Sequence, residues 1–116
     1  MTMPILKIQT NAAIDHQKRQ PLLEKASQRI AAALNKPEQY MMVSLEADRP
    51  MMFAGTREPT AFLELKAIGL PTAKTGELSR LLSELVESEL GVAKQRIYIY
   101  FADVPASLWG WNGETF

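Results

Sequence analysis

Cysteine is absent from this sequence of 116 residues. Its absence excludes disulfide bridges, thiolate metal sites and thiol nucleophiles together. Histidine is almost as scarce: His16 is the one example, and it lies in a polar run where we expect a solvated side chain. A zinc site or a Ser-His-Asp triad would have to be built on His16, and no cluster of carboxylates surrounds it in the sequence. We therefore expect no metal site.

Neither sign of charge dominates. Lys and Arg together number 13, as do Asp and Glu, so the formal net charge is zero. No overall field favours nucleic acid or an anionic membrane, and we expect neither as a partner. Long hydrophobic runs are also missing, and the N-terminal residues lack the basic and apolar segments of a signal peptide. We expect a cytoplasmic protein, with export by a non-classical route left open.

Familiar catalytic motifs are missing as well. No glycine-rich phosphate loop follows a strand, no Gly-x-Ser-x-Gly elbow occurs, and the carboxylates are scattered along the chain. The length suits a single domain over residues 1–116. Motif searching alone therefore assigns no chemistry to this domain.

What the sequence does contain is a strand–helix–strand pattern that occurs twice. Apolar residues in strand patterns predict strands over 4–10, 41–47, 61–67 and 97–101, with an irregular stretch over 48–59. Apolar residues at helical spacing predict one helix in each half, carried by Leu23, Ala26, Ile30, Ala33 and Leu34 in the first and by Leu78, Leu81, Leu82, Leu85 and Val86 in the second. We predict two βαβ units, each joining parallel strands through a right-handed crossover.

Residues that begin or end helices fit this arrangement. Pro21 is expected only near the start of the first helix, because an interior proline costs about 3 kcal/mol. Thr72 or Thr75 is expected to cap the N-terminus of the second helix. Asn35 and Gly91 are expected at the C-terminal ends, where glycine and asparagine favour left-handed geometry.

The predicted strands have one apolar and one polar face. The apolar face carries Leu6, Ile8, Val43, Leu45, Leu63, Leu65, Ile97 and Ile99, and the polar face carries Lys7, Gln9, Ser44, Glu46, Glu64 and Lys66. Parallel strands covered on both sides would be apolar nearly throughout. We therefore predict an α+β, two-layer sandwich: a four-stranded sheet with two helices on one face and a bare second face that meets water or another subunit.

The C-terminal tail favours assembly. Beyond the last predicted strand, residues 104–116 contain four large apolar side chains, Leu108, Trp109, Trp111 and Phe116. A monomer would expose much of their area, and such patches mark interfaces or pockets. Packing of the tail on the protein's own helices is the alternative, and we favour an oligomer.

Six short segments, taken in order, carry a resemblance to a known family. They are Met3-Pro4-Ile5, Asn35-Lys36-Pro37-Glu38-Gln39-Tyr40, Glu58-Pro59, Ala67-Ile68-Gly69, Arg96-Ile97-Tyr98-Ile99 and Gly110-Trp111-Asn112-Gly113-Glu114-Thr115-Phe116. No segment is specific alone. Their joint order and spacing, on a double βαβ pattern, resemble the macrophage migration inhibitory factor family of the tautomerase superfamily, whose members include D-dopachrome tautomerase. The resemblance spans nearly the whole chain, from Pro4 to Phe116.

This resemblance implies a homotrimer with a site at each subunit boundary and a reaction that needs no cofactor. Mature members of the family begin at a proline after loss of the initiator methionine, and the matching position is Pro4. A free N-terminal proline is a secondary amine that can act as a general base, whereas an internal proline nitrogen is an amide without useful basicity. The plainer interpretation is a proline that opens a strand, where its missing N–H costs nothing.

The resemblance also implies further site residues. Lys36 matches a lysine that binds the substrate carboxylate and helps to keep the proline neutral; its plainer interpretation is a solvated loop lysine. Ile68 matches a position that contributes through its backbone, and Tyr98 matches a tyrosine supplied by the neighbouring subunit; both are also ordinary strand residues. An aromatic wall, which trimer packing would explain equally well, is matched by Tyr40, Trp111 and Phe116.

The N-terminus departs from the family pattern. Met1 and Thr2 precede Met3-Pro4, and translation from Met1 would lock the nitrogen of Pro4 in an amide. We predict that the native chain starts at Met3, so that removal of this methionine exposes Pro4.

Two further departures concern chemistry and specificity. Tyr100 stands where the best-known animal members carry asparagine, and it shares a strand face with Tyr98, so we expect it to narrow the substrate pocket. The Cys-x-x-Cys segment of animal members is replaced here by Thr60-Ala61-Phe62-Leu63. Thiol oxidoreductase chemistry therefore cannot apply to this chain.

The leading functional hypothesis is a cofactor-independent keto–enol tautomerase for phenylpyruvate-type or related enolisable carboxylates. The alternative is a cytokine-like binding or signalling protein whose tautomerase site is vestigial or blocked; the sequence indicates no particular receptor. Hydration-dehalogenation or decarboxylation, which relatives perform with arginines near the proline, ranks last. After the third predicted strand this chain offers only Lys74 before Arg80.

Overall fold

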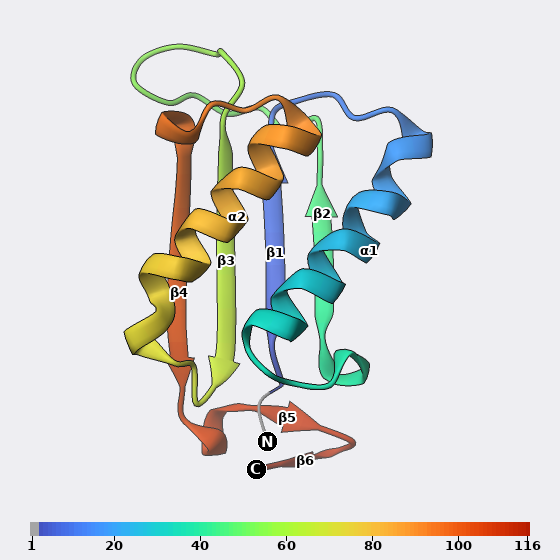
Figure 1. Ribbon diagram of the computed structural model, residues 1–116, viewed down its shortest axis with the longest axis vertical. Coiled ribbons are helices and arrows are strands. Elements are labelled where there is room, and N and C mark those ends of the chain that lie inside the picture. Colours follow the sequence, from blue (N-terminus) through green and yellow to red (C-terminus); the bar gives the residue numbers. More distant parts are fainter. Residues whose placement is uncertain (1–2) are drawn as a thin grey trace.

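The computed structural model describes residues 3–116, so Met1 and Thr2, on which the predicted start at Met3 depends, lie outside the described residues. The strands are β1 (Ile5–Thr10), β2 (Met42–Glu46), β3 (Ala61–Ile68), β4 (Ile97–Val104), β5 (Gly110–Trp111) and β6 (Glu114–Thr115); the α-helices are α1 (His16–Ala33) and α2 (Thr75–Leu90). Short 3₁₀ turns are η1 (Glu38–Tyr40), η2 (Thr72–Lys74), η3 (Lys94–Arg96) and η4 (Ala106–Leu108). Figure 1 shows the two helices crossing the main sheet and the β5–β6 hairpin below it.

The main sheet has four strands in the order β2-β1-β3-β4. β1 and β2 are parallel, as are β3 and β4, which confirms the two predicted βαβ units. The units join through an antiparallel pairing of β1 with β3, in which Leu6 stands opposite Leu65 and Ile8 opposite Leu63. The β-sheet is therefore mixed. The N-terminal ends of β1 and β2 and the C-terminal ends of β3 and β4 lie at the same end of the sheet.

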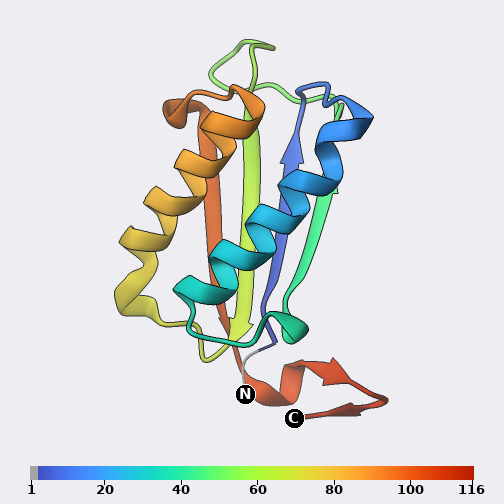
Figure 2. The same ribbon diagram turned by 45° about the vertical axis from the view of Figure 1, so that its right-hand side comes forward.

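Both helices cover the same face of this sheet, as Figure 2 shows, and confirm the predicted two layers. Four apolar residues of β1 and β3 are fully buried between the layers, where they share one core with Ala26 and Ile30 of α1 and Leu82 and Leu85 of α2; they are Leu6, Ile8, Leu63 and Leu65. One predicted core position is wrong. Leu22 is 1% exposed, whereas Leu23 is only half-buried, because residues 22, 26, 30 and 34 follow the stripe that faces the sheet.

The ends of α1 differ in part from expectation. The helix begins at His16, whose side chain is exposed as predicted, after an N-cap at Asp15 that accepts a hydrogen bond from the backbone N–H of Gln17 at 3.4 Å. Pro21 consequently lies inside the helix rather than at its start. The missing N–H of Pro21 removes one intrahelical bond near the N-terminus. At the other end Asn35 has the expected positive φ, 55°.

The ends of α2 show one error and one confirmation. Neither Thr72 nor Thr75 caps the helix: Lys74 holds the N-cap position without a side-chain hydrogen bond. The hydroxyl of Thr75 instead donates to the carbonyl of Thr72 at 3.2 Å, within the turn that precedes the helix. Gly91 follows the helix with a φ of 69°, as expected for a left-handed terminal residue.

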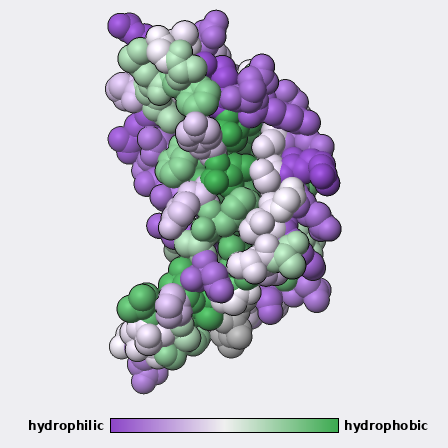
Figure 3. Space-filling model, turned by 90° about the vertical axis from the view of Figure 1, so that its left-hand side faces the viewer, coloured by the Kyte–Doolittle hydropathy of each residue, from purple (hydrophilic) through white to green (hydrophobic). Residues whose placement is uncertain are grey.

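The second face of the sheet carries no helix, and it combines charged side chains with the exposed rings of Tyr98 and Tyr100 on β4. Its side chains form surface ion pairs, with Lys7 Nζ 3.6 Å and Arg49 Nη2 3.2 Å from Glu46 Oε1, and Lys66 Nζ 3.8 Å from Glu64 Oε2. Surface pairs of this kind contribute little stability individually. On the side of the molecule that carries β4, apolar residues gather in the middle and at the lower end, where the C-terminal tail lies (Figure 3).

Candidate functional site

A cleft of about 470 Å³ opens at the edge of the sheet where β1 and β2 begin. Three segments far apart in the sequence line it: the residues that lead into β1, the η1 turn with the start of β2, and the end of η4 with β5. Their members are Met3, Pro4, Ile5, Gln39, Tyr40, Met41, Met42, Trp109, Gly110 and Trp111. None of these lining residues carries a formal charge at neutral pH, so the cleft offers an amine little compensation for a positive charge.

Pro4 is buried at the base of this cleft. It immediately precedes β1, where a residue without an N–H breaks no ladder bond. Its carbonyl accepts a hydrogen bond from the backbone N–H of Met42 at 3.0 Å, which ties it to the start of β2. Met3, 6% exposed, occupies the space next to it.

Aromatic rings form one wall of the cleft. Tyr40 approaches from η1, and Trp109 and Trp111 approach from the tail. The ring of Trp111 stacks on that of Phe116, with centroids 6.3 Å apart and planes 8° apart. The backbone N–H of Phe116 donates to the carbonyl of Trp109 at 3.3 Å, which closes the tail on itself. The structure thus brings Pro4, Tyr40 and Trp111 together, with Phe116 behind Trp111.

The hairpin that holds these tryptophans was not predicted. β5 and β6 pair in antiparallel fashion around Asn112 and Gly113, whose φ angles are 55° and 78°. Both values are positive, as a type I′ turn requires, and Asn-Gly is the dipeptide that favours this turn most. The sequence signal was therefore present at this position.

Seven lining residues were missed as site residues: Met3, Ile5, Gln39, Met41, Met42, Trp109 and Gly110. Met42 is 62% exposed, although it begins a strand of the main sheet. No local pattern marks these residues, because their place in the cleft depends on how the η1 turn and the tail meet Pro4.

Lys36 and Ile68 lie near the cleft but do not line it. Lys36 is half-buried in the turn after α1, where its backbone N–H donates to the carbonyl of Ala31 at 2.9 Å. Ile68 ends β3, the strand beside β1, at the same edge of the sheet. The C-terminal ends of α1 and β3 both lie at the end of the sheet where β1 begins (Figure 1).

Tyr98 and Tyr100 lie elsewhere. They stand near the start of β4, opposite Phe62 and Glu64, at 64% and 54% exposure on the face without helices. The start of β4 pairs with the start of β3, and β3 runs antiparallel to β1, so Tyr98 stands toward the far end of the sheet from Pro4. A single chain does not bring Tyr98 to the cleft. The two tyrosines do share one face, as predicted.

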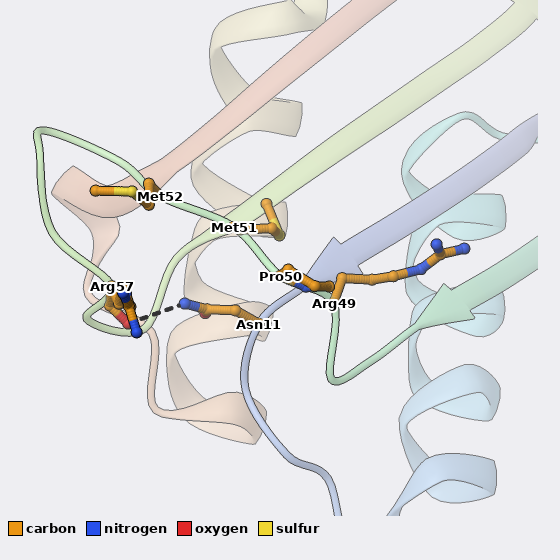
Figure 4. A pocket seen from close by; sticks show the side chains of 6 residues that line it. All are labelled: Asn11, Arg49, Pro50, Met51, Met52 and Arg57. Carbon is orange, nitrogen blue, oxygen red and sulfur yellow. Dashed lines mark hydrogen bonds between the residues drawn. The ribbon is translucent and has the colours of Figure 1, made fainter.

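A second cavity, of about 540 Å³, lies at the far end of the sheet and is lined by Asn11, Arg49, Pro50, Met51, Met52 and Arg57. In Figure 4, the Arg49 side chain extends away from Arg57, and the Asn11 amide donates to the carbonyl of Arg57 at 3.1 Å. Arg49 is already paired with Glu46. The cavity contains none of the predicted site residues and presents no converging polar groups.

Two negative findings hold for residues 3–116. The described residues contain no group of three or more His, Cys, Asp or Glu side chains placed to hold a metal ion. Within the same range, neither helix combines the length and apolar character that a membrane crossing requires.

Comparison with known proteins places this chain. A family model described as macrophage migration inhibitory factor matches residues 3–116. Macrophage migration inhibitory factor from Mus musculus is 38% identical over 95 residues, covering 81% of this chain and 83% of that protein, and the homolog from Brugia malayi is 36% identical over 115 residues, covering 98% and 99%. The crystal structure of a homologue from Prochlorococcus marinus superposes with a TM-score of 0.91 at 44% identity, covering 97% of this chain and 98% of the other. The chain therefore belongs to the macrophage migration inhibitory factor family.

Proposed function

We propose that this chain is a cofactor-independent keto–enol tautomerase that uses Pro4, once freed as the N-terminal residue, as its general base. The family lies within the tautomerase superfamily, which supports isomerase chemistry in general. The observation that carries the proposal is the burial of Pro4 in an uncharged cleft walled by Tyr40, Trp109 and Trp111. Such surroundings disfavour an ammonium ion and so favour the neutral amine that a base requires.

The proposed reaction moves one proton between carbon and oxygen of the substrate. In the keto-to-enol direction, the lone pair of the Pro4 nitrogen takes a proton from the carbon next to the carbonyl, and the electrons of that C–H bond shift to the carbonyl oxygen to leave an enolate. Transfer of the proton from the ammonium to the enolate oxygen gives the enol and restores the neutral amine; in the reverse direction the proton is taken from oxygen and delivered to carbon. Phenylpyruvate-type carboxylates fit the proposal because aromatic rings on the wall suit an aryl group.

The remaining roles are proposed on the resemblance and on position. Lys36 would bind the substrate carboxylate, and Ile68 would contribute through its backbone. Trp111, stacked on Phe116, would shield the reacting atoms from water together with Tyr40. Tyr98 stands far from Pro4 within one chain, so its proposed hydrogen bond to substrate requires a second copy. We therefore propose a homotrimer in which Tyr98, and beside it Tyr100, reach the neighbouring subunit's cleft.

The proposal depends on the state of the Pro4 nitrogen. As long as Met3 is attached, this nitrogen is a tertiary amide and cannot act as a base. A cytokine-like binding protein is the second candidate. The observation that favours it is that Met1 and Thr2 precede Met3-Pro4 in the sequence, because translation from Met1 leaves the nitrogen of Pro4 in an amide. Intact mass of the native protein distinguishes a chain that begins at Pro4 from one that retains Met3.

A Pro4→Gly substitution in the processed protein tests the base directly. Glycine keeps a free terminal amine but replaces a secondary amine by a primary one and removes the ring that fixes its direction. We expect the rate with phenylpyruvate to fall by about a hundredfold or more. The sedimentation behaviour should stay that of the parent protein, and equal rates in the two proteins would exclude Pro4 as the base.

A further inference from the structure

We propose that Phe53 and Arg96 are positioning residues for Tyr98, which they hold in one orientation for use by the neighbouring subunit. We call the contacts among these three residues the Tyr98 brace. The inference rests on the proposed function, because Tyr98 acts there on substrate bound in another chain's cleft. It concerns a surface that lies at the opposite end of the sheet from Pro4.

The brace begins with an aromatic contact. The ring of Phe53 meets that of Tyr98 edge to face, with centroids 4.9 Å apart and planes at 86°. Tyr98 is nevertheless 64% exposed, so most of its side chain is free of packing. An exposed tyrosine on an edge strand normally exchanges between rotamers, and one well-oriented ring contact restricts that exchange.

Arg96 holds the ring of Phe53, which in turn contacts Tyr98. Its guanidinium carbon lies 5.2 Å from the centroid of Phe53, within range of a cation–π interaction. The guanidinium is itself held, because Nε donates to the carbonyl of Pro59 at 2.9 Å and Nη2 donates to that of Glu58 at 3.1 Å. Phe53 therefore has a tethered cation as one neighbour and Tyr98 as another.

The loop that carries these acceptors is anchored to β1 and β4. The Asn11 amide, just beyond β1, donates to the carbonyls of Arg57 and Glu58 at 3.1 Å each and accepts from the N–H of Thr60 at 2.9 Å. The Thr60 hydroxyl donates to the carbonyl of Arg96 at 2.7 Å. A continuous set of contacts thus joins the end of β1 to the guanidinium beneath Phe53.

Phe53 has its own local support. Its N–H and carbonyl both bond to Thr56 at 3.0 Å across a two-residue turn, Ala54 and Gly55, with φ angles of 52° and 77°. This turn places Phe53 at the base of a tight loop, with little freedom to leave Tyr98. Phe53 thus meets Tyr98 from one side, and the rest of the tyrosine side chain, including its hydroxyl, is open to solvent or a partner.

A double-mutant cycle tests this role. Phe53→Leu removes the ring contact, and Tyr98→Phe removes the hydroxyl that the brace is proposed to direct. We expect Phe53→Leu to lower kcat/KM for phenylpyruvate by about three- to tenfold in the parent, and by less than about twofold when Tyr98 is already phenylalanine. Equal factors in both backgrounds would show that Phe53 acts independently of the tyrosine hydroxyl and would overturn the proposal.

Four further variants separate positioning from general damage. Phe62 stands opposite Tyr98 in the β3–β4 pair, so Phe62→Leu makes the same substitution beside the same tyrosine. This variant should have nearly the kcat/KM of the parent protein. Phe53→Tyr keeps an aromatic ring at this position and should keep the kcat/KM of the parent protein, unlike Phe53→Leu. Arg96→Met should resemble Phe53→Leu, whereas Arg57→Met, which removes a neighbouring arginine outside the brace, should not.

A measurement without substrate keeps this inference separate from the proposed function. In the parent protein, the ring protons of Tyr98 should show nuclear Overhauser effects to Phe53 and a ring-current shift, and both should disappear in Phe53→Leu but persist in Phe62→Leu. An unchanged Tyr98 spectrum in Phe53→Leu would overturn the brace whatever the activity. Inactivity of the processed parent protein would instead contradict the proposed function, and the spectrum alone would then decide whether Tyr98 is held.

Discussion

Met42 forms the backbone hydrogen bond that joins Pro4 to the neighbouring strand β2. Its backbone N–H bonds the Pro4 carbonyl at 3.0 Å, while its own side chain remains 62% exposed at the cleft. The base proposed for this protein is thus held by a main-chain contact that does not depend on the identity of the neighbouring side chain. Its environment, in contrast, depends on the side chains of Tyr40, Trp109 and Trp111.

Leu22 and Leu23 offer a residue-scale prediction. Leu22 is 1% exposed and faces the sheet, whereas Leu23 is only half-buried. Leu22→Ala should lower the free energy of unfolding by about 2–5 kcal/mol, because it leaves a cavity in the core, and Leu23→Ala should cost less than half as much. Urea unfolding at one fixed protein concentration measures both values, and the reverse order would contradict the helix orientation.

At this scale, three of the residues named from the sequence, Pro4, Tyr40 and Trp111, line one cleft, and their roles there stay predictions. Met42 and Trp109 were not foreseen, since nothing in their local pattern distinguishes a strand or tail residue that lines a cleft from one that meets solvent. Choosing Leu23 over Leu22 was an error of one position, because adjacent leucines fit the apolar stripe almost equally well.

At the scale of elements, the chain turns where backbone geometry allows it. Gly91 ends α2 with a φ of 69°, and the β5–β6 hairpin turns through Asn112 and Gly113 at positive φ. The first turn lets the chain return from α2 so that β4 pairs parallel with β3, and the second brings Trp111 to the cleft. The position of the aromatic wall is therefore a consequence of turn chemistry as well as of apolar packing.

Gly76 lies inside α2 and Gly91 directly follows it, and the two positions give opposite predictions for stability. A Cβ at either Gly76 or Gly91 would have no neighbour within 4 Å, so neither substitution causes a clash. Gly91→Ala should lower the free energy of unfolding by about 1–2 kcal/mol, because alanine disfavours left-handed geometry. Gly76→Ala, inside the helix, should raise it by about 0.5–1 kcal/mol. Changes of the same sign in thermal or urea unfolding would contradict this explanation.

Periodicity predicted the strands and helices well, and local interactions at their ends explain where it failed. β4 continues to Val104 instead of ending at residue 101, because its last residues still pair with Lys66, Ala67 and Ile68 of β3. The N-cap of α2 was missed because a 3₁₀ turn precedes the helix and uses the Thr75 hydroxyl. Such choices between neighbouring hydrogen bonds leave no trace in an apolar pattern.

At the scale of the whole molecule, the two ends of the sheet carry different halves of the proposed site. Pro4 and the aromatic wall occupy one end, and the Tyr98 brace occupies the other. A second copy must therefore present its Tyr98 end to the Pro4 end of the first, and a head-to-tail ring satisfies this at every boundary. This separation is the physical reason for proposing an assembly, and the number of three copies follows from the family resemblance.

Leu108 gives a prediction about assembly. It is 74% exposed in the single chain, so Leu108→Ser should change the stability of an isolated subunit by less than about 0.5 kcal/mol. If the tail contributes to the interface, the same change should weaken self-association. Sedimentation equilibrium should give three times the chain mass of 13.0 kDa for the parent and a lower average for the variant. A parent mass of 13.0 kDa would contradict the trimer.

The central claim concerns the nitrogen of Pro4, and one comparison of two proteins tests it. A chain that begins at Pro4 is assayed with phenylpyruvate beside a chain that retains Met3 and is otherwise identical. The account predicts that the first is active and that the second is slower by about 10²–10⁴-fold, because the amide nitrogen has no lone pair available for proton transfer. Equal rates in the two proteins would contradict it.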